Sequence, residues 1–116
     1  MRDNLIQKKS YEYALDIIKI YFKLAKQKEF VISRQLLRSG TSIGANIEEA
    51  IGGQSRKDFV AKMSIAYKEA RETFYWLRLM KDSNILETEL ANKLLEKCEE
   101  ILKILGAILK TTKNNS

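Results

Sequence analysis

A chain of 116 residues has the length of one ordinary domain, and its 45% hydrophobic and 31% charged residues exclude a disordered protein. It has no proline and five glycines, so helix breakers are scarce. Its formal net charge of +6 gives an electrostatic field that favours anionic partners. The polar first ten residues lack the apolar segment of a signal peptide, and no run approaches the ~20 apolar residues that span a bilayer. We expect a single cytoplasmic domain, residues 1–116, with no membrane contact.

The first predicted helix covers residues 4–27. One set of its apolar residues recurs at spacings of three and four, the period of a helix: Tyr11, Leu15, Ile18, Phe22 and Ala25. A second set widens the apolar arc beyond one face: Ile17, Ile20 and Leu24. An arc of this width predicts contact with more than one neighbour, within a bundle or across subunits.

The second predicted helix covers residues 33–51, with Ser33 as its N-cap. A run of small residues, 39–46, lies in its middle. Each glycine in a helix costs about 1 kcal/mol relative to alanine, so Gly40 and Gly44, one turn apart, predict the close approach of another helix. The alternative is a break into two short helices.

Four residues of this run are candidates for helix packing or oligomer contacts: Gly40, Ser42, Gly44 and Asn46. Asn46 stands among small and apolar residues, so we expect it to point inward or into an interface and to be hydrogen-bonded there. A buried asparagine often fixes register and oligomer state, and we prefer that role to ligand binding.

Gly52 and Gly53 predict the end of the second helix, because glycine tolerates the left-handed backbone that closes a C-terminus. Ser55, with Asp58 three residues on, is close to a capping box and predicts a new start.

The third and fourth helices are predicted over residues 56–81 and 87–110. Their apolar stripes are Phe59, Met63, Ala66, Ala70, Phe74, Leu77 and Met80, then Leu90, Leu94, Cys98, Ile101, Leu105 and Ile108. Helices joined by short loops pack as antiparallel neighbours. The predicted fold is therefore all-α, an antiparallel up-down-up-down four-helix bundle.

The sequence predicts no catalytic residue, no metal site and no cofactor, and we expect the protein not to be an enzyme. Histidine is absent, which removes the commonest general base and metal ligand. Glu69 and Glu72 share a helix face, but we favour solvated charges or partners of Arg38, Arg71 and Lys68 over a hard-metal site. Cys98 falls on an apolar stripe and is interpreted as a small buried hydrophobe.

Positive charge is concentrated in the first part of the chain. Residues 1–46 hold nine Lys and Arg against four Asp and Glu, a balance of +5. Phosphate contacts require such residues, and the candidates for nucleic-acid binding are Lys19, Lys23, Lys26, Arg34 and Arg38. The alternative is that these cations form solvated faces and that the protein is a protein-interaction scaffold.

The run from Arg34 to Ala50, which contains the core Ser-Ile-x-x-Asn-Ile-x-Glu, resembles the hallmark of the 23S rRNA-intervening sequence proteins, bacterial four-helix-bundle proteins. The resemblance continues through 52–59, 64–70 and 72–77. Many relatives have proline where Gly44 stands and glycine where Ala50 stands, which suggests a subfamily.

The resemblance implies a homopentamer of four-helix bundles, related to a basic pentameric accessory protein of diversity-generating retroelements that works with a reverse transcriptase and nucleic acid. Some family members are encoded inside insertions in the large rRNA gene, which implies a connection with RNA through genomic position. We therefore expect a basic, non-enzymatic helical module that binds structured RNA or a ribonucleoprotein.

Overall fold

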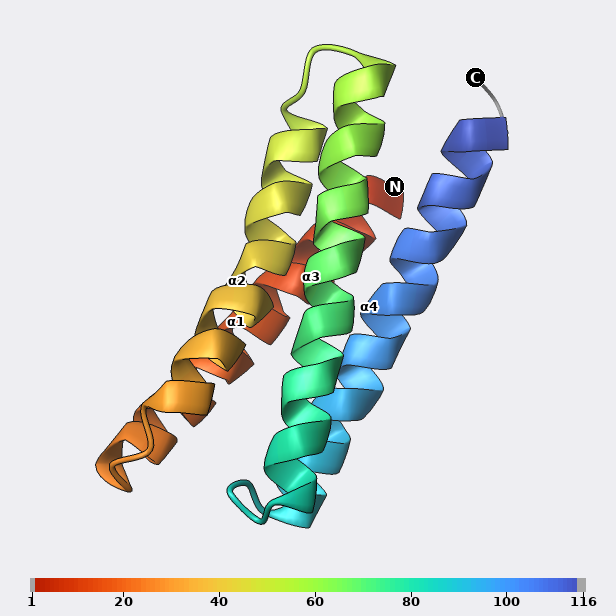
Figure 1. Ribbon diagram of the computed structural model, residues 1–116. Coiled ribbons are helices and arrows are strands. Elements are labelled where there is room, and N and C mark those ends of the chain that lie inside the picture. The colour runs from red at the N-terminus through yellow and green to blue at the C-terminus, as the bar shows by residue number, and fades with distance from the viewer. Residues whose placement is uncertain (1, 115–116) are drawn as a thin grey trace.

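The computed structural model describes residues 2–114, with side chains from residue 5 onward. It contains four helices: α1 (Arg2–Lys26), α2 (Val31–Ile51), α3 (Arg56–Asp82) and α4 (Thr88–Asn114). They alternate in direction along a bundle with extents of 47 × 21 × 20 Å (Figure 1). No strand occurs within residues 2–114. The prediction of an all-α, up-down-up-down four-helix bundle is confirmed.

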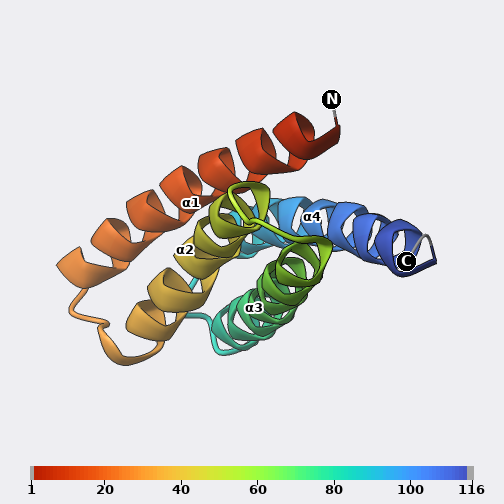
Figure 2. The same cartoon turned by 90° about the horizontal axis from the view of Figure 1, so that it is seen from above.

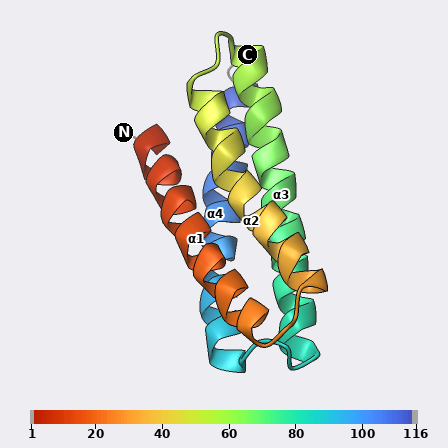
Figure 3. The same ribbon diagram turned by 90° about the vertical axis from the view of Figure 1, so that its left-hand side faces the viewer.

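Sequential helices are neighbours, and the loops that join them alternate between the two ends of the bundle (Figure 3). The contact between α2 and α3 is the most extensive, whereas α1 meets α4 over a short length because it lies oblique to it (Figure 2). Within the described residues, no helix combines the length and hydropathy that would let it cross a membrane.

The core is a continuous set of buried aliphatic side chains from all four helices. Its polar members are paired: the Tyr13 hydroxyl donates to the Leu94 carbonyl at 2.9 Å, and the Cys98 thiol to the Ala70 carbonyl at 3.2 Å. Burial raises the pKa of the Cys98 thiol to about 12, against a smaller lowering by its hydrogen bond with Tyr13. Cys98 is thus the buried small hydrophobe that its place on the stripe predicts.

Of the two apolar sets of α1, one is buried in the core and the other is exposed. The side chains that enter the core are Ile6, Tyr13, Ile17, Ile20 and Leu24. The set with the clearer helical spacing lies on the outside instead: Tyr11, Leu15, Ile18 and Phe22. We call these four residues the outer stripe. Both sets have the period of a helix, so the spacing alone does not decide which one faces the core.

The start of α2 differs from the prediction. The helix begins at Val31, and the Glu29 carboxylate accepts the amide hydrogens of Ile32 at 2.9 Å and Ser33 at 3.0 Å. Ser33 is buried and donates its hydroxyl to the Glu29 carbonyl at 2.8 Å, so its assignment as N-cap was wrong. A carboxylate satisfies two helix-end amides at once, and here it replaces the serine.

The other helix ends are partly as predicted. Ser55 caps α3, because its hydroxyl accepts the Asp58 amide at 3.1 Å, which confirms the predicted restart. The left-handed residue expected at Gly52 is absent: Gly52 has φ −82°, and the described positive φ values belong to Lys28 and Asn84. Glycine is nevertheless favoured at position 53, since a Cβ there would make a tight contact of 3.1 Å with the Ala50 carbonyl oxygen.

Candidate nucleic-acid interface

Three of the predicted cations share the solvent-facing side of α1. Lys19, Lys23 and Lys26 follow one another at spacings of four and three and are exposed. At Lys19 this row reaches a hollow of about 180 Å³ between α1 and α4. The rim of the hollow is charged, and its apolar lining comes from Ile20, Leu90 and Leu94.

Two lysines of α4 complete the cationic rim of this hollow. Lys93 and Lys97 stand one turn apart beside Lys19, and Lys97 forms an ion pair with Asp16 at 2.8 Å. We call Lys19, Lys23, Lys26, Lys93 and Lys97 the basic face. Sequence reasoning missed the two α4 lysines because their convergence with α1 depends on how the first and last helices meet. Their spacing of four was the only local signal.

Arg34 lies apart from the basic face, in the first turns of α2. Its guanidinium carbon stands 5.6 Å from the centroid of the Phe30 ring, an exposed cation–π contact that leaves the polar edge free to bind an anion. The contact joins the arginine to the residue that precedes the helix.

Arg38 lies between α2 and α3, away from the lysines. Its guanidinium binds Glu69 at 3.1 Å and also Glu72, whose carboxylate accepts the Trp76 indole N–H at 2.8 Å. A phosphate would have to displace two carboxylates to reach this arginine. The same geometry accounts for the two glutamates as partners of a cation, the role that the sequence favoured for them.

The two glycines of α2 lie at its contact with α1. A Cβ on Gly40 would stand 2.9 Å from two side-chain carbons of Ile17, and one on Gly44 would stand 3.4 Å from the Ser10 carbonyl oxygen. Helix α2 is unbroken through this run, so the alternative of two short helices is excluded. The glycines therefore bring the two backbones close together within one chain.

Asn46 and Ser42 form a local pair on the neighbouring side of α2. The Asn46 amide donates to the Ser42 carbonyl at 2.8 Å, one turn back in the same helix, and both residues are half-buried. Deeper between α2 and α3, the hydroxyls of Ser39 and Thr73 meet at 2.9 Å. The buried polar pair is thus Ser39 with Thr73, whereas Asn46 bonds its own helix.

The outer stripe adds an apolar surface to the exposed side of α1. Tyr11 is 63% exposed and Phe22 62% exposed. Beside Tyr11 is a hollow of about 230 Å³ that includes the small residues Ala14, Gly44 and Ala45. Apolar side chains in register along about three turns of one helix form a contiguous patch of the kind that marks interaction sites.

The chemistry that this arrangement offers is charge and apolar contact. Among the described residues, no three His, Cys, Asp or Glu side chains converge as a metal site would need. The two carboxylates that share one face of α3, Glu69 and Glu72, bind Arg38.

The comparisons agree on one family. The family model described as 23S rRNA-intervening sequence protein matches residues 2–107. A crystal structure of a protein of unknown function from the S23 ribosomal protein family of Bacteroides thetaiotaomicron VPI-5482 is 49% identical, with a TM-score of 0.91, over 95% of this chain and 99% of that chain. No curated protein matches. The chain belongs to the 23S rRNA-intervening sequence protein family.

Proposed function

We propose that the protein is a non-enzymatic, homo-oligomeric module that binds structured RNA through the basic face. The observation that carries the proposal is the convergence of Lys19 from α1 with Lys93 and Lys97 from α4. The hollow holds three lysines against one acid, Asp16, and Lys23 and Lys26 continue the row along α1. Lysines that neutralise phosphates release counterions, which drives binding to nucleic acid without reading its sequence.

Two further facts support RNA as the polyanion. The family takes its name from sequences that interrupt 23S rRNA, and the chain carries a net charge of +6. Double-stranded RNA is bound mainly through phosphates and shape, for which a rigid row of lysines along a helix is suited. Arg34 is a further phosphate contact in this proposal, whereas Arg38 holds α2 to α3.

The absence of enzyme activity is part of the same proposal. The sequence has no histidine, and the one cysteine is buried with its pKa raised to about 12, so it is not a ready nucleophile. The protein then acts by binding and assembly.

The outer stripe supports assembly from copies of this chain. Leu15 and Ile18 are exposed between the two aromatic rings that end the stripe, and a second copy would remove this surface from water. The family resemblance favours five copies. A symmetric assembly repeats the basic face once per subunit, so that a long RNA can contact several faces at once and bind more tightly than one subunit would.

The direct test is a titration with a structured RNA duplex at several salt concentrations. Lys19→Gln with Lys93→Gln removes two charges from the basic face. Lys103→Gln with Lys110→Gln removes two charges from exposed lysines elsewhere on α4 and is the matched control. We expect the first variant to bind more weakly, with a shallower log–log salt slope by about 1.8 at ~0.9 per phosphate, and the control to resemble the wild type.

Equal effects of the two variants would show that only net charge matters and that the basic face is not the site. No binding by the wild type at low salt would leave the second candidate, a protein-interaction scaffold, which the exposed outer stripe favours independently.

A further inference from the structure

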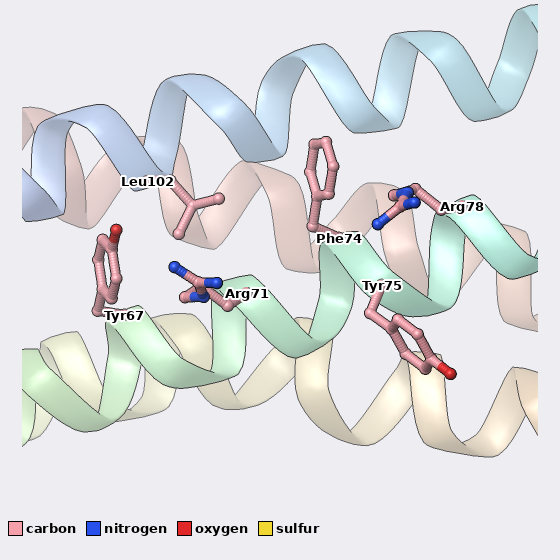
Figure 4. Close-up of a pocket in the computed structure, with 6 residues that line it drawn as sticks. All are labelled: Tyr67, Arg71, Phe74, Tyr75, Arg78 and Leu102. Carbon is pink, nitrogen blue, oxygen red and sulfur yellow. The ribbon is translucent and has the colours of Figure 1, made fainter.

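A second groove lies on the other side of α4, where it packs against α3. It is a hollow of about 250 Å³ that contains three aromatic rings and two arginines: Tyr67, Arg71, Phe74, Tyr75, Arg78 and Leu102. Figure 4 shows Tyr67 and Phe74 pointing toward α4 and the guanidinium groups of Arg71 and Arg78 on either side of Phe74. We call these six residues the aromatic groove.

The two arginines of the groove are available to an anion. Both are exposed, and within the described residues neither forms an ion pair. The acids nearest to Arg71 in the sequence, Glu69 and Glu72, bind Arg38 on the α2 side of the helix. Glu69 and Glu72 therefore do not neutralise Arg71 and Arg78, and within the described residues Asp82, one turn after Arg78, forms no ion pair with it either.

The aromatic rings of the groove are held in place. Tyr75, 51% exposed, meets the Trp76 ring edge-to-face with centroids 5.4 Å apart. Tyr67 lies against the backbone of α4 at Gly106, where a Cβ would stand 3.7 Å from the tyrosine ring. Tyr67 and Phe74 are half-buried, whereas Tyr75 is exposed and its ring points away from α4, toward the α2 side of the groove (Figure 4).

We propose that the aromatic groove binds an unpaired stretch of RNA, with phosphates on Arg71 and Arg78 and a base stacked on the Tyr75 ring. This inference rests on the proposed function, since it assigns a second contact for the same ligand class. The bases of a duplex are already stacked, whereas those of loops and ends can be splayed out onto aromatic side chains. Structured RNA contains both duplex and unpaired segments. The basic face would bind the duplex, and the aromatic groove would bind the unpaired ends.

The order of residues along α3 favours a nucleic acid over an acidic peptide. Guanidinium, ring and guanidinium follow one another at positions 71, 74 or 75, and 78, two helical turns of about 5.4 Å each. In a polynucleotide each base branches from a sugar that lies between two phosphates, so two phosphates can meet the arginines while the base meets the ring. An acidic peptide would satisfy the arginines but would leave the exposed ring without a stacking partner.

Positive charge continues along the same side of α3 toward its N-terminus. Arg56, Lys57 and Lys113 surround Val60 in a further hollow of about 420 Å³.

The experiment compares two fluorescent probes, a 12-nucleotide single-stranded RNA and a 12-base-pair RNA duplex, on the full chain at several salt concentrations. Arg71→Gln with Arg78→Gln should weaken single-strand binding about tenfold or more and make its log–log salt slope shallower by about 1.4, at ~0.7 per phosphate. Its duplex affinity should change less than threefold. Lys19→Gln with Lys93→Gln, which removes the same charge from the basic face, should show the opposite preference.

Tyr75→Leu separates stacking from charge. It should weaken single-strand binding about fivefold or more and leave the salt slope unchanged, because a base loses its stacking partner but no phosphate contact is lost. Circular dichroism and solution mass should match the wild type for each variant, since the altered side chains are exposed.

Three results would overturn the aromatic groove as an RNA site while the proposed function stands. In the first, the wild type binds the duplex but not the single strand. In the second, the two double variants weaken both probes equally. In the third, the arginine variant changes the solution mass but not RNA affinity, which would make the groove a subunit contact. A wild type that binds neither probe would overturn both the proposed function and this inference.

Discussion

Helix α1 carries two apolar stripes, of which one builds the fold and the other lies on the surface. Ile17 and Ile18 are adjacent, of the same residue type and in the same helix, yet Ile17 is 0% exposed and Ile18 is 36% exposed. Ile17 packs over Gly40 of α2, whereas Ile18 belongs to the outer stripe. Hydrophobicity and spacing therefore identify a helix face that needs a partner, but they do not show whether that partner is the same chain.

The largest expected effect is on the buried stripe. Ile17→Ala should lower the free energy of unfolding by about 3 kcal/mol, because it removes buried methylene groups and leaves a cavity against α2. Ile18→Ala is the matched control and should cost less than about 0.5 kcal/mol in the isolated chain. Denaturant titration of both variants checks the pair. Similar losses would mean that the two stripes do not differ in burial as described.

The next largest effect is expected at the contact between α1 and α2. Gly44→Leu should lower the free energy of unfolding by about 2 kcal/mol, since the added side chain meets the Ser10 backbone and forces the helices apart. Ala45→Leu, at an exposed neighbouring position of the same helix, should be nearly neutral. Thermal unfolding followed by circular dichroism measures both. An unchanged melting temperature for Gly44→Leu would contradict close packing at this point.

A smaller effect is expected at the loop that turns α1 into α2. Partial burial raises the pKa of Glu29, but hydrogen bonds from the Ile32 and Ser33 amides outweigh it and the net pKa lies below the ordinary value. Glu29→Gln should therefore cost about 1 kcal/mol near neutral pH.

The pH dependence of this cost has a definite sign. A carboxylate with a lowered pKa in the folded state contributes stability that is present above its unfolded pKa and is lost as the pH falls through the folded value. The gap between wild type and Glu29→Gln should thus shrink when unfolding is measured at increasingly acid pH, below about 4. A gap that stays constant down to pH 2 would exclude the charged cap.

The sequence predicted the fold but only part of the candidate site. Helices and the Ser55 cap were predictable because their signals lie within a few residues of one another. The capping role of Glu29 was not, since Ser33 is the stronger local signal. Arg38 was predicted in two roles, as a partner of Glu69 and Glu72 and as a phosphate contact. The sequence could not decide between them, because the two glutamates lie on another helix, more than 30 residues away.

The same limit applies to the two cationic surfaces. Lys19 and Lys93 come together only through the closure of the bundle between its first and last helices. Arg71 and Arg78 could be placed on one side of α3 from their spacing of seven, but their freedom from ion pairs depends on Glu72 facing the other way. Charge composition predicts that the protein favours polyanions. Which cations are available to bind one depends on how the helices pack.

Substitutions in the outer stripe should affect the fold least, and they test directly whether the two stripes of α1 have different partners. Leu15→Lys with Phe22→Lys should reduce the solution mass to that of one chain, because charges replace the apolar surface that a second copy would cover. Helicity should be kept. The free energy of unfolding of the dissociated chain should change by less than about 0.5 kcal/mol, as is usual for surface substitutions. Ile65→Lys with Leu79→Lys adds the same charge to exposed apolar positions of α3 and controls for repulsion. If the control dissociates and the outer-stripe variant does not, the copies meet on α3, and the outer stripe of α1 remains open to another protein.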